Sequence, residues 1–388
     1  MDRLKIFFLA KDNRGGMDTL LKQMRLLDNK KFVKSFYLFR KEDNVVYGKN
    51  DFFLNEKYPI QLQFTFGKLF LFFSNLKKTY KAIKSQNPEI LFTCDVYSFI
   101  VVSLIKLISR NWCLIHLFNN NFYRIIMERP GKIYAKTILK SFKVLSRVCD
   151  LMIFTSSGLK KFTYGKMLDK SVITKIIPNS VDISKINELI LKPLSIQEKK
   201  YFTHRHKCRV FSVGRLDEQK DFKTVLRTFK LIVERLPNSQ LFIIGEGSLR
   251  EDLKRLSIEL GISQKTYFLG WKSNVYKYLK YADVFLFSSF YEGFAQVIVE
   301  TMACGVPVVA TDSPFGPKEI LQNGKYGIIV PVGDYKGLSE GALKILSDES
   351  LGDYYAKEGF RRAQDFETKN MLRGYEQLFI NIAESNVL

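Results

Sequence analysis

Short apolar runs alternate with longer amphipathic stretches through the second half of the chain. Apolar runs of about five residues are typical of buried parallel strands, and amphipathic stretches of ten or more are typical of the helices that cover them. We expect strands at 209–214, 240–245, 266–270, 284–288 and 306–310, separated by helices at 221–235, 248–261, 273–281 and 295–303. This succession predicts a parallel, doubly wound α/β sheet.

The first half follows the same pattern less regularly. Apolar runs predict strands at 4–10, 90–93, 112–117 and 151–155, and a helix is expected from about residue 17. A chain of 388 residues is too long for one compact core. We therefore expect two Rossmann-like domains, at 1–190 and 191–365, and a C-terminal helix at 366–388 that packs back on the first domain.

The composition narrows the class of protein. The cysteines are odd in number and scattered, without a CxxC pair: Cys94, Cys113, Cys149, Cys208 and Cys304. This pattern favours a reducing cytosol over a disulfide framework or a zinc site. The longest apolar stretch, 96–108, contains Lys106 and is too short to cross a bilayer, so we expect a cytoplasmic protein.

Positive charge is concentrated in one half of the chain. The formal net charge is +22, and residues 1–200 hold 36 Lys and Arg against 16 Asp and Glu. An excess of this size implies an anionic partner for the first half, which is a membrane surface, a phosphorylated acceptor or a nucleic acid.

Two glutamates mark the most informative segment. Glu292 follows the expected strand 284–288, and Glu300 lies about two turns along the helix that comes next. Ligands of open parallel sheets bind outside the carboxyl ends of the strands, against helix N-termini. Both carboxylates are therefore expected to face one ligand.

Two other strand ends carry candidate binding residues. Arg215 and Lys220 follow the strand 209–214, where two cations would suit a diphosphate, although a solvated basic loop gives the same pattern. Glu246 lies between two glycines after the strand 240–245. This turn would let a flat ligand approach the backbone, but it is also an ordinary turn before a helix.

The order of these motifs resembles the nucleotide-binding domain of retaining GT-B glycosyltransferases, specifically family 4. The matching motifs, in chain order, are GRLDEQKD, GEG, FLGW, ADVFLFSSFYEGFAQVIVE, ACGVPVVAT, GPKEIL and GIIVPVGD. Glu292 and Glu300 form the E-x7-E pattern of the family. The resemblance implies two doubly wound domains facing across a cleft, with the nucleotide sugar on the second domain and the acceptor on the first.

The resemblance also implies a role for each donor-site residue. Arg215 and Lys220 would neutralise the diphosphate, Glu300 would bind the ribose, and Glu292 would bind the hydroxyls of the sugar. The donor-binding set is Gly15, Gly16, Arg215, Lys220, Glu246, Gly293, Phe294, Ala295 and Glu300. The family has no DxD metal motif, so we expect neither a metal nor another cofactor, and transfer with retention of anomeric configuration.

In the first domain, Gly15 and Gly16 match the glycine turn of the family, although such a pair also forms ordinary turns. His116 ends a buried strand, where the family often places a histidine near the reacting centre. The catalytic candidates are therefore Glu292, His116, Arg215 and Lys220. A lone strand histidine is also often structural, and the sequence leaves both interpretations of His116 open.

Two basic stripes account for much of the charge. Helical spacing aligns Lys132, Lys136, Lys140, Lys143 and Arg147 on one helix, and Lys77, Lys81 and Lys84 on another that also carries phenylalanines. Such helices bind anionic membrane surfaces, although a core helix with a solvated basic face has the same pattern. We expect peripheral attachment to the inner face of a bacterial-type membrane.

The predicted function is transfer of a hexose or N-acetylhexosamine from a nucleotide sugar, UDP-linked, to a lipid-linked or surface-polysaccharide acceptor. A nucleotide-sugar 2-epimerase of the same fold is the first alternative, and it would need no acceptor. A basic nucleic-acid-binding protein is the second alternative. Since the chain carries no recognised nucleic-acid motif, we expect no nucleic-acid partner.

Overall fold

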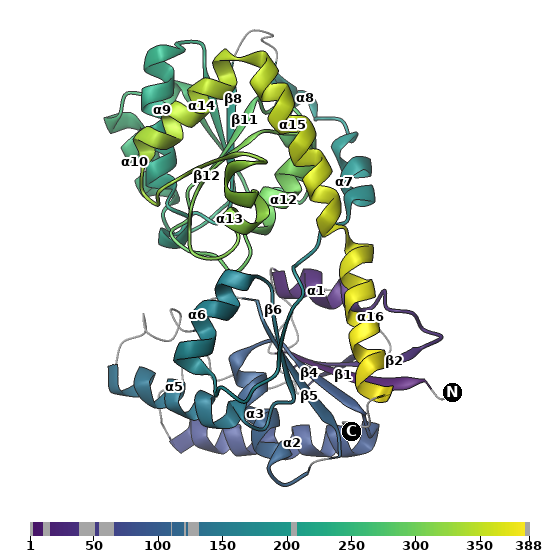
Figure 1. Ribbon diagram of the computed structural model, residues 1–388. Coiled ribbons are helices and arrows are strands. Elements are labelled where there is room, and N and C mark those ends of the chain that lie inside the picture. The colour runs from purple at the N-terminus through teal and green to yellow at the C-terminus, as the bar shows by residue number, and fades with distance from the viewer. Residues whose placement is uncertain are drawn as a thin grey trace. The chain divides into compact units, whose positions relative to one another are not determined.

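The chain forms two compact α/β units in a computed structural model (Figure 1). The structure describes residues 3–10, 16–38, 51–53, 66–109, 111–119, 122, 132–202 and 208–384. Unit 1 comprises Met1–Pro178 and Met371–Leu388, and unit 2 comprises Asn179–Asn370.

Unit 1 is built on a seven-stranded parallel sheet in the order β3-β2-β1-β4-β5-β6-β7. Its strands are β1 (Leu4–Ala10), β2 (Phe32–Leu38), β3 (Asp51–Phe53), β4 (Ile90–Thr93), β5 (Cys113–Phe118), β6 (Leu151–Phe154) and β7 (Thr174–Ile176). The strand order reverses between β1 and β4, which is where doubly wound sheets bind ligands.

Helices cover both faces of this sheet. They are α1 (Gly16–Met24), α2 (Phe66–Gln86), α3 (Val96–Lys106), α5 (Lys132–Ser146), α6 (Ser157–Met167) and α16 (Thr368–Glu384). On one face, α1 and α16 enclose a core that includes Leu20, Ile115 and Phe379. On the other face, Phe99 of α3 and Phe142 of α5 pack 4.5 Å apart, measured between ring centroids.

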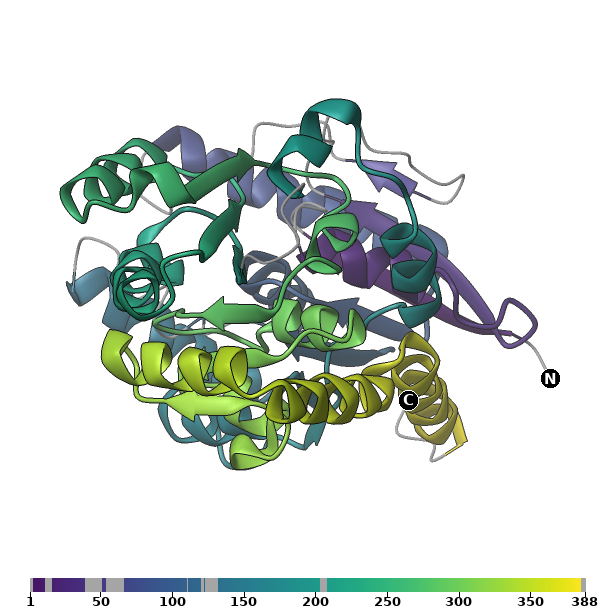
Figure 2. The ribbon, with the colours of Figure 1, turned by 90° about the horizontal axis from the view of Figure 1, so that it is seen from above.

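Helix α16 comes from the far end of the chain, and it is yellow in Figure 1 and Figure 2. Met371, Tyr375, Leu378 and Phe379 recur at helical spacing and are buried with side chains of β1 and β4. The apolar face of the helix therefore belongs to the core of unit 1.

Unit 2 has a six-stranded parallel sheet in the order β10-β9-β8-β11-β12-β13. Its strands are β8 (Arg209–Val213), β9 (Gln240–Ile244), β10 (Thr266–Gly270), β11 (Val284–Phe287), β12 (Val308–Thr311) and β13 (Ile328–Val330). Here the order reverses between β8 and β11. The loops that follow these two strands are therefore neighbours at the carboxyl edge of the sheet.

Alternate residues of each strand point to opposite faces of the sheet, so unit 2 has one hydrophobic core on each face. Val210, Ile243 and Leu286 pack with α9 (Phe222–Arg235), α10 (Arg250–Glu259) and α14 (Tyr335–Ser347). Side chains on the opposite face pack with α7 (Ile183–Ile190), α11 (Tyr276–Leu279) and α12 (Gln296–Ala303). The remaining helices are α8 (Ile196–Lys199), α13 (Pro317–Ile320), α15 (Glu349–Ala363) and the 3-10 turns η1 to η5, of which η2 (Glu218–Lys220) matters most below.

The units divide elsewhere than at the expected boundaries of 190 and 365. The division falls after Pro178 and after Asn370. Ile183 and Ile186 of α7 are buried in the core of unit 2, so the segment that follows Pro178 already packs with the second sheet. Within the described ranges, no helix is both long and apolar enough to cross a membrane.

Candidate active site

An ion pair joins the two loops at the reversal point of the second sheet. Lys220 ends the turn after β8, and Glu292 lies in the loop after β11. The Lys220 Nζ atom lies 2.5 Å from Glu292 Oε1, and the two side chains are 19% and 10% exposed. The structure thus brings together a cation and a carboxylate that lie 72 positions apart in the sequence.

Glu292 is held in place by its own loop. The Ser289 hydroxyl donates to Glu292 Oε1 at 2.7 Å, and the Glu292 backbone N–H donates to the Pro314 carbonyl at 3.2 Å. Thr311 at the end of β12 donates to the Ser289 carbonyl at 3.1 Å. These bonds fix both the carboxylate and its backbone, and such preorganisation is what a binding site for a polar ligand requires.

Lys220 is presented by a capped turn. Asp217 precedes η2, and its side chain accepts from the Lys220 backbone N–H at 3.2 Å. Gly214 lies beside the lysine stem, since a Cβ atom there would be in ordinary van der Waals contact with Lys220 Cγ and Cδ at 3.6 Å. The ammonium group therefore reaches Glu292 over the end of β8.

Arg215 occupies the same loop but is far more open. Its side chain is 69% exposed, and its Nη1 atom lies 2.9 Å from Asp217 Oδ2. An exposed guanidinium with five donors is suited to bidentate contacts with a phosphate that arrives from solvent.

The loop after β9 approaches the loop after β8 closely. Gly245 has φ +149°, and a Cβ atom there would lie 1.8 Å from the Gly214 carbonyl oxygen. Only glycine is compatible with this contact. The neighbouring Glu246 is half exposed, and its carboxylate forms an ion pair with Arg250 at the start of α10. The structure therefore shows a protein partner for the carboxylate that we assigned to the donor.

Gly293, Phe294 and Ala295 form a tight entry to α12. Ala295 has φ +63°, in the left-handed region, and the side chains of Phe294 and Ala295 are buried. The Phe294 ring packs edge-on against Phe366 at 5.5 Å in the core. Because the aromatic ring points inward, the part of this segment that a ligand could contact is its backbone.

Glu300 lies in the second turn of α12. Its Oε1 atom accepts from Gln296 Nε2 at 3.2 Å, and the Tyr276 side chain also hydrogen-bonds the carboxylate. Burial raises the pKa of Glu300 above its usual value of 4.5, and these two bonds and the charge of Lys220 partly oppose that shift. The influence of Lys220 places Glu300 in the same electrostatic environment as the Lys220–Glu292 pair.

The sequence did not point to three polar partners in this cluster, namely Ser289, Gln219 and Tyr276. Ser289 donates to Glu292, Gln219 accepts from Arg215 Nη2 at 3.2 Å, and Tyr276 bonds Glu300. The position of Ser289 after a buried strand was the only usable signal, since polar residues at strand ends face ligands. The other two contacts depend on how the loops pack.

His116 lies in the core of unit 1. It is 0% exposed, and its ring is surrounded by Phe99, Phe118, Phe122 and Phe142. Its Nδ1 atom lies 2.9 Å from the Thr93 hydroxyl, and its Nε2 atom has no hydrogen-bond partner within the described part of the chain. Burial lowers its pKa to about 3, so the imidazole is neutral near pH 7. A catalytic role for His116 stays a prediction.

The glycine turn of the first domain is only partly visible. Gly15 lies outside the described residues, and Gly16 is the first residue of α1. Whether these glycines approach a donor phosphate stays a prediction.

The two basic stripes lie on exposed helix faces. On α5, Lys136, Lys140, Lys143 and Arg147 are exposed, whereas Phe142 is fully buried; the side chain of Lys132 is outside the described set. On α2, Lys77, Lys81 and Lys84 are exposed, and Phe73 on the same face is 57% exposed. Arg147 is paired with Asp169 at 2.9 Å, and the lysines form the rest of the stripe.

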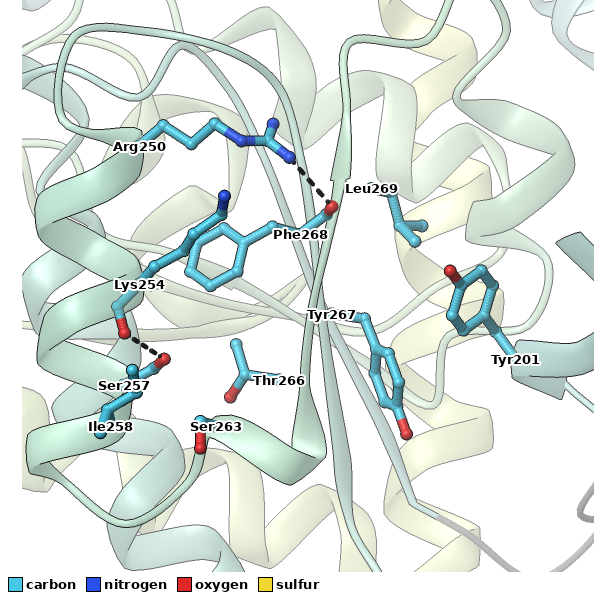
Figure 3. A pocket seen from close by; sticks show the side chains of 10 residues that line it. All are labelled: Tyr201, Arg250, Lys254, Ser257, Ile258, Ser263, Thr266, Tyr267, Phe268 and Leu269. Carbon is cyan, nitrogen blue, oxygen red and sulfur yellow. Dashed lines mark hydrogen bonds between the residues drawn. The ribbon is translucent and has the colours of Figure 1, made fainter.

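A pocket of about 480 Å³ lies away from the acidic loop, between α10 and the edge strand β10 (Figure 3). Figure 3 shows Arg250, near Lys254, donating to the Phe268 carbonyl, a bond of 3.4 Å, while Tyr201 and Tyr267 lie on the other side of β10. The described residues that line it include no carboxylate. Among all the described residues, no group of three or more His, Cys, Asp or Glu is placed to hold a metal ion.

Two doubly wound parallel sheets, the second with paired acidic and basic loops at its reversal point, are the architecture of the GT-B fold. Residues 196–362 match the model of the glycosyl transferases group 1 family. This match, together with the relatives and solved structures described next, confirms the predicted GT-B fold and the predicted glycosyltransferase class.

Individual proteins show the same likeness. An uncharacterised glycosyltransferase of Methanocaldococcus jannaschii is 29% identical over 344 residues, which is 79% of this chain and 83% of the relative. A Campylobacter jejuni N-acetylgalactosaminyltransferase, named for an N-acetylgalactosamine-N,N'-diacetylbacillosaminyl-diphospho-undecaprenol substrate, is 28% identical over 66% of this chain and 69% of its own. The structure of HepE from Anabaena in complex with UDP superposes with a TM-score of 0.76 at 18% identity, covering 97% of this chain and 100% of HepE.

Proposed function

We propose that this glycosyltransferase moves a hexose or N-acetylhexosamine from a UDP-sugar to a lipid-linked or surface-polysaccharide acceptor, with retention of anomeric configuration. The carrying observation is the Lys220–Glu292 pair at the reversal point of the second sheet. A cation and a carboxylate at this position match the two ends of a sugar diphosphate.

In this proposal, each residue of the site binds a different part of the nucleotide sugar. Lys220 has three donors, so it can keep its bond to Glu292 and still bind a phosphate oxygen. Arg215 binds the same diphosphate from solvent. Glu292 accepts hydrogen bonds from the sugar hydroxyls, and Glu300 accepts them from the ribose.

Transfer then proceeds by exchange at the anomeric carbon. The bond from this carbon to the diphosphate oxygen breaks, and a bond to the acceptor oxygen forms on the same face of the sugar. The acceptor hydroxyl gives its proton to the departing diphosphate. Fixed positive groups at Lys220 and Arg215 stabilise the charge that develops on this leaving group, without reorganisation at the moment of reaction.

The UDP and lipid parts of the proposal have separate support. HepE, which shares the fold, was solved with UDP, and the Campylobacter relative is named for an undecaprenyl diphosphate substrate. In this chain, the exposed lysines of α5 and α2 provide a surface for an anionic leaflet. Each such lysine contributes about 1 kcal/mol near anionic lipid. We therefore propose peripheral attachment of unit 1 to the inner face of a bacterial-type membrane.

The donor is tested with a panel of nucleotide sugars. A donor that binds the native state raises the apparent melting temperature, and the best one is then incubated with and without an undecaprenyl diphosphate saccharide. We expect stabilisation by UDP-sugars and a glycosylated lipid only when the acceptor is present. An epimerised sugar from donor alone would instead support the epimerase alternative.

Membrane attachment is tested by sedimentation with vesicles that contain anionic phospholipid. Replacing Lys136, Lys140 and Lys143 by glutamate should abolish binding. The matched control replaces Lys223, Lys230 and Lys254 of unit 2, which make surface ion pairs there. Unchanged binding by the α5 variant, or equal loss in both variants, would contradict attachment through α5.

A further inference from the structure

Gln219 connects the two loops of the active site in both directions. Its backbone carbonyl accepts from the Phe290 backbone N–H at 2.8 Å, and its side-chain Nε2 atom donates to the Tyr291 backbone carbonyl at 2.9 Å. Both contacts are to residues that directly precede Glu292. Through its backbone and its half-buried side chain, Gln219 thus ties the turn of Lys220 to the loop of the sugar-binding carboxylate.

The free oxygen of the same amide is used for Arg215. Gln219 Oε1 accepts from Arg215 Nη2 at 3.2 Å, while Asp217 holds the Nη1 atom of the same guanidinium at 2.9 Å. An arginine that is 69% exposed would otherwise sample many rotamers. The amide donates on one side to the Glu292 loop and accepts on the other from Arg215, so its orientation fixes both.

The rest of the turn has anchors of its own. The Ser288 hydroxyl lies 2.8 Å from the Lys220 carbonyl and 3.0 Å from the Asp221 carbonyl, and it donates to both. Asp217 caps the Lys220 backbone. Removing the Gln219 side chain therefore leaves Lys220 held in place, and the change falls on Arg215 and on the bond to the Tyr291 carbonyl.

We propose that Gln219 is a positioning residue that sets the Arg215 guanidinium for the diphosphate of the donor and links it to the Glu292 loop. This inference rests on the proposed function, because it takes the diphosphate as the ligand of Arg215. Toward UDP, Gln219 acts through Arg215, so its effect is confined to the diphosphate. Its bond to Tyr291 acts on the Glu292 loop, which is assigned to the sugar that UDP lacks.

The test compares the binding of UDP and of uridine to the full chain. Gln219→Ala should weaken UDP binding about tenfold, the range for loss of a hydrogen bond to a charged group. Uridine binding should not change, because uridine has no phosphate. The control is Glu218→Gln on the same turn, whose side chain faces Lys223 on the surface.

A double-mutant cycle identifies the path of the effect. In the Arg215→Ala background, Gln219→Ala should cause no further loss of UDP affinity. Equal weakening of UDP and uridine, additive losses in the cycle, or wild-type UDP affinity in Gln219→Ala would each overturn the inference. If the wild-type protein binds no nucleoside diphosphate at all, the proposed function itself fails. The absence of wild-type binding can be told apart from the three outcomes that overturn the inference, because each of those outcomes requires that the wild type binds UDP.

Discussion

The contact between Lys220 and Glu292 is the residue-level basis of the proposed chemistry. Both side chains are largely withdrawn from water, and Ser289 donates to the same carboxylate oxygen. Two charges placed this way attract each other more strongly than a surface pair, and either one left alone would carry a desolvation cost.

Lys220→Ala should reduce transfer by about 10²–10³-fold, the range for removal of one preorganised donor to developing negative charge. It should also lower stability by about 1–3 kcal/mol, because Glu292 loses a buried partner. Steady-state kinetics and thermal unfolding measure the two effects. Lys223→Ala is the control, since Lys223 forms an exposed pair with Glu218 and should affect neither. Full activity in Lys220→Ala would remove this residue from the mechanism.

Glu300 is predicted to lower the stability of the fold at neutral pH and to strengthen binding of the nucleoside part of the donor. Its pKa is raised by burial, so the native state holds its proton more tightly than the unfolded chain does. This group's contribution to stability therefore falls as pH rises above the usual carboxylate range near 4.5.

Glu300→Gln removes the ionisable group from that buried position. At neutral pH it should raise the melting temperature, and the gain should shrink as pH falls below that range. It should also weaken binding of the nucleoside part of the donor, because an amide replaces a carboxylate. Melting curves against pH and titration with uridine measure both effects. A lower melting temperature at neutral pH would show that the carboxylate stabilises the fold instead.

Residue types and spacing allowed the acids and cations of the site to be predicted. Glu292, Glu300, Arg215 and Lys220 all follow strands that are visible as apolar runs. Their partners depend on the register between loops. Tyr276 reaches Glu300 from the start of α11, and nothing in its local sequence indicates that contact.

At the scale of elements, the reversal of strand order between β8 and β11 creates the site. β8 pairs with β9 on one side and with β11 on the other. The loops after β8 and β11 therefore lie side by side, although the two strands are far apart in the sequence. Most of the buried strands were predicted to within one or two residues because both of their faces are apolar. The inner strand β2 escaped prediction because Lys34 and Ser35 interrupt its apolar run. Short or half-exposed edge strands, such as β7 and β13, escaped prediction because they lack that signal.

Loop packing gives a prediction at Gly316. This glycine has φ +114°, and a Cβ atom there would lie 2.3 Å from the Phe294 carbonyl oxygen, beside the entry to α12. Gly316→Ala should displace the Phe294 backbone and reduce donor affinity. Strain at this φ should also destabilise the fold by about 1–3 kcal/mol.

Gly324→Ala is the matched control for Gly316→Ala. Gly324 has φ +102° but nothing within 4 Å of an added Cβ atom, so it carries the backbone strain without the clash. Donor titration and thermal unfolding should show destabilisation in both variants and lost affinity only in Gly316→Ala. Equal donor affinity in the two variants would contradict a role for the Phe294 backbone in binding.

At the scale of the whole molecule, charge and chemistry are divided between the two halves of the chain. Unit 2 carries the acidic and basic loops, whereas residues 1–200 carry 36 of the 61 Lys and Arg. Composition alone showed this asymmetry. It left the partner of the first half open, because anionic lipid and nucleic acid attract the same charge.

The central claim is that the loops after β8 and β11 bind a nucleotide sugar and transfer its sugar to an acceptor. The most direct test measures release of UDP from a UDP-sugar with an undecaprenyl diphosphate saccharide, for the wild type and Glu292→Gln. We predict acceptor-dependent release by the wild type and a loss of about 10²-fold or more in the folded variant, which keeps the shape of the side chain but not its charge. Equal release by the two proteins would contradict the account.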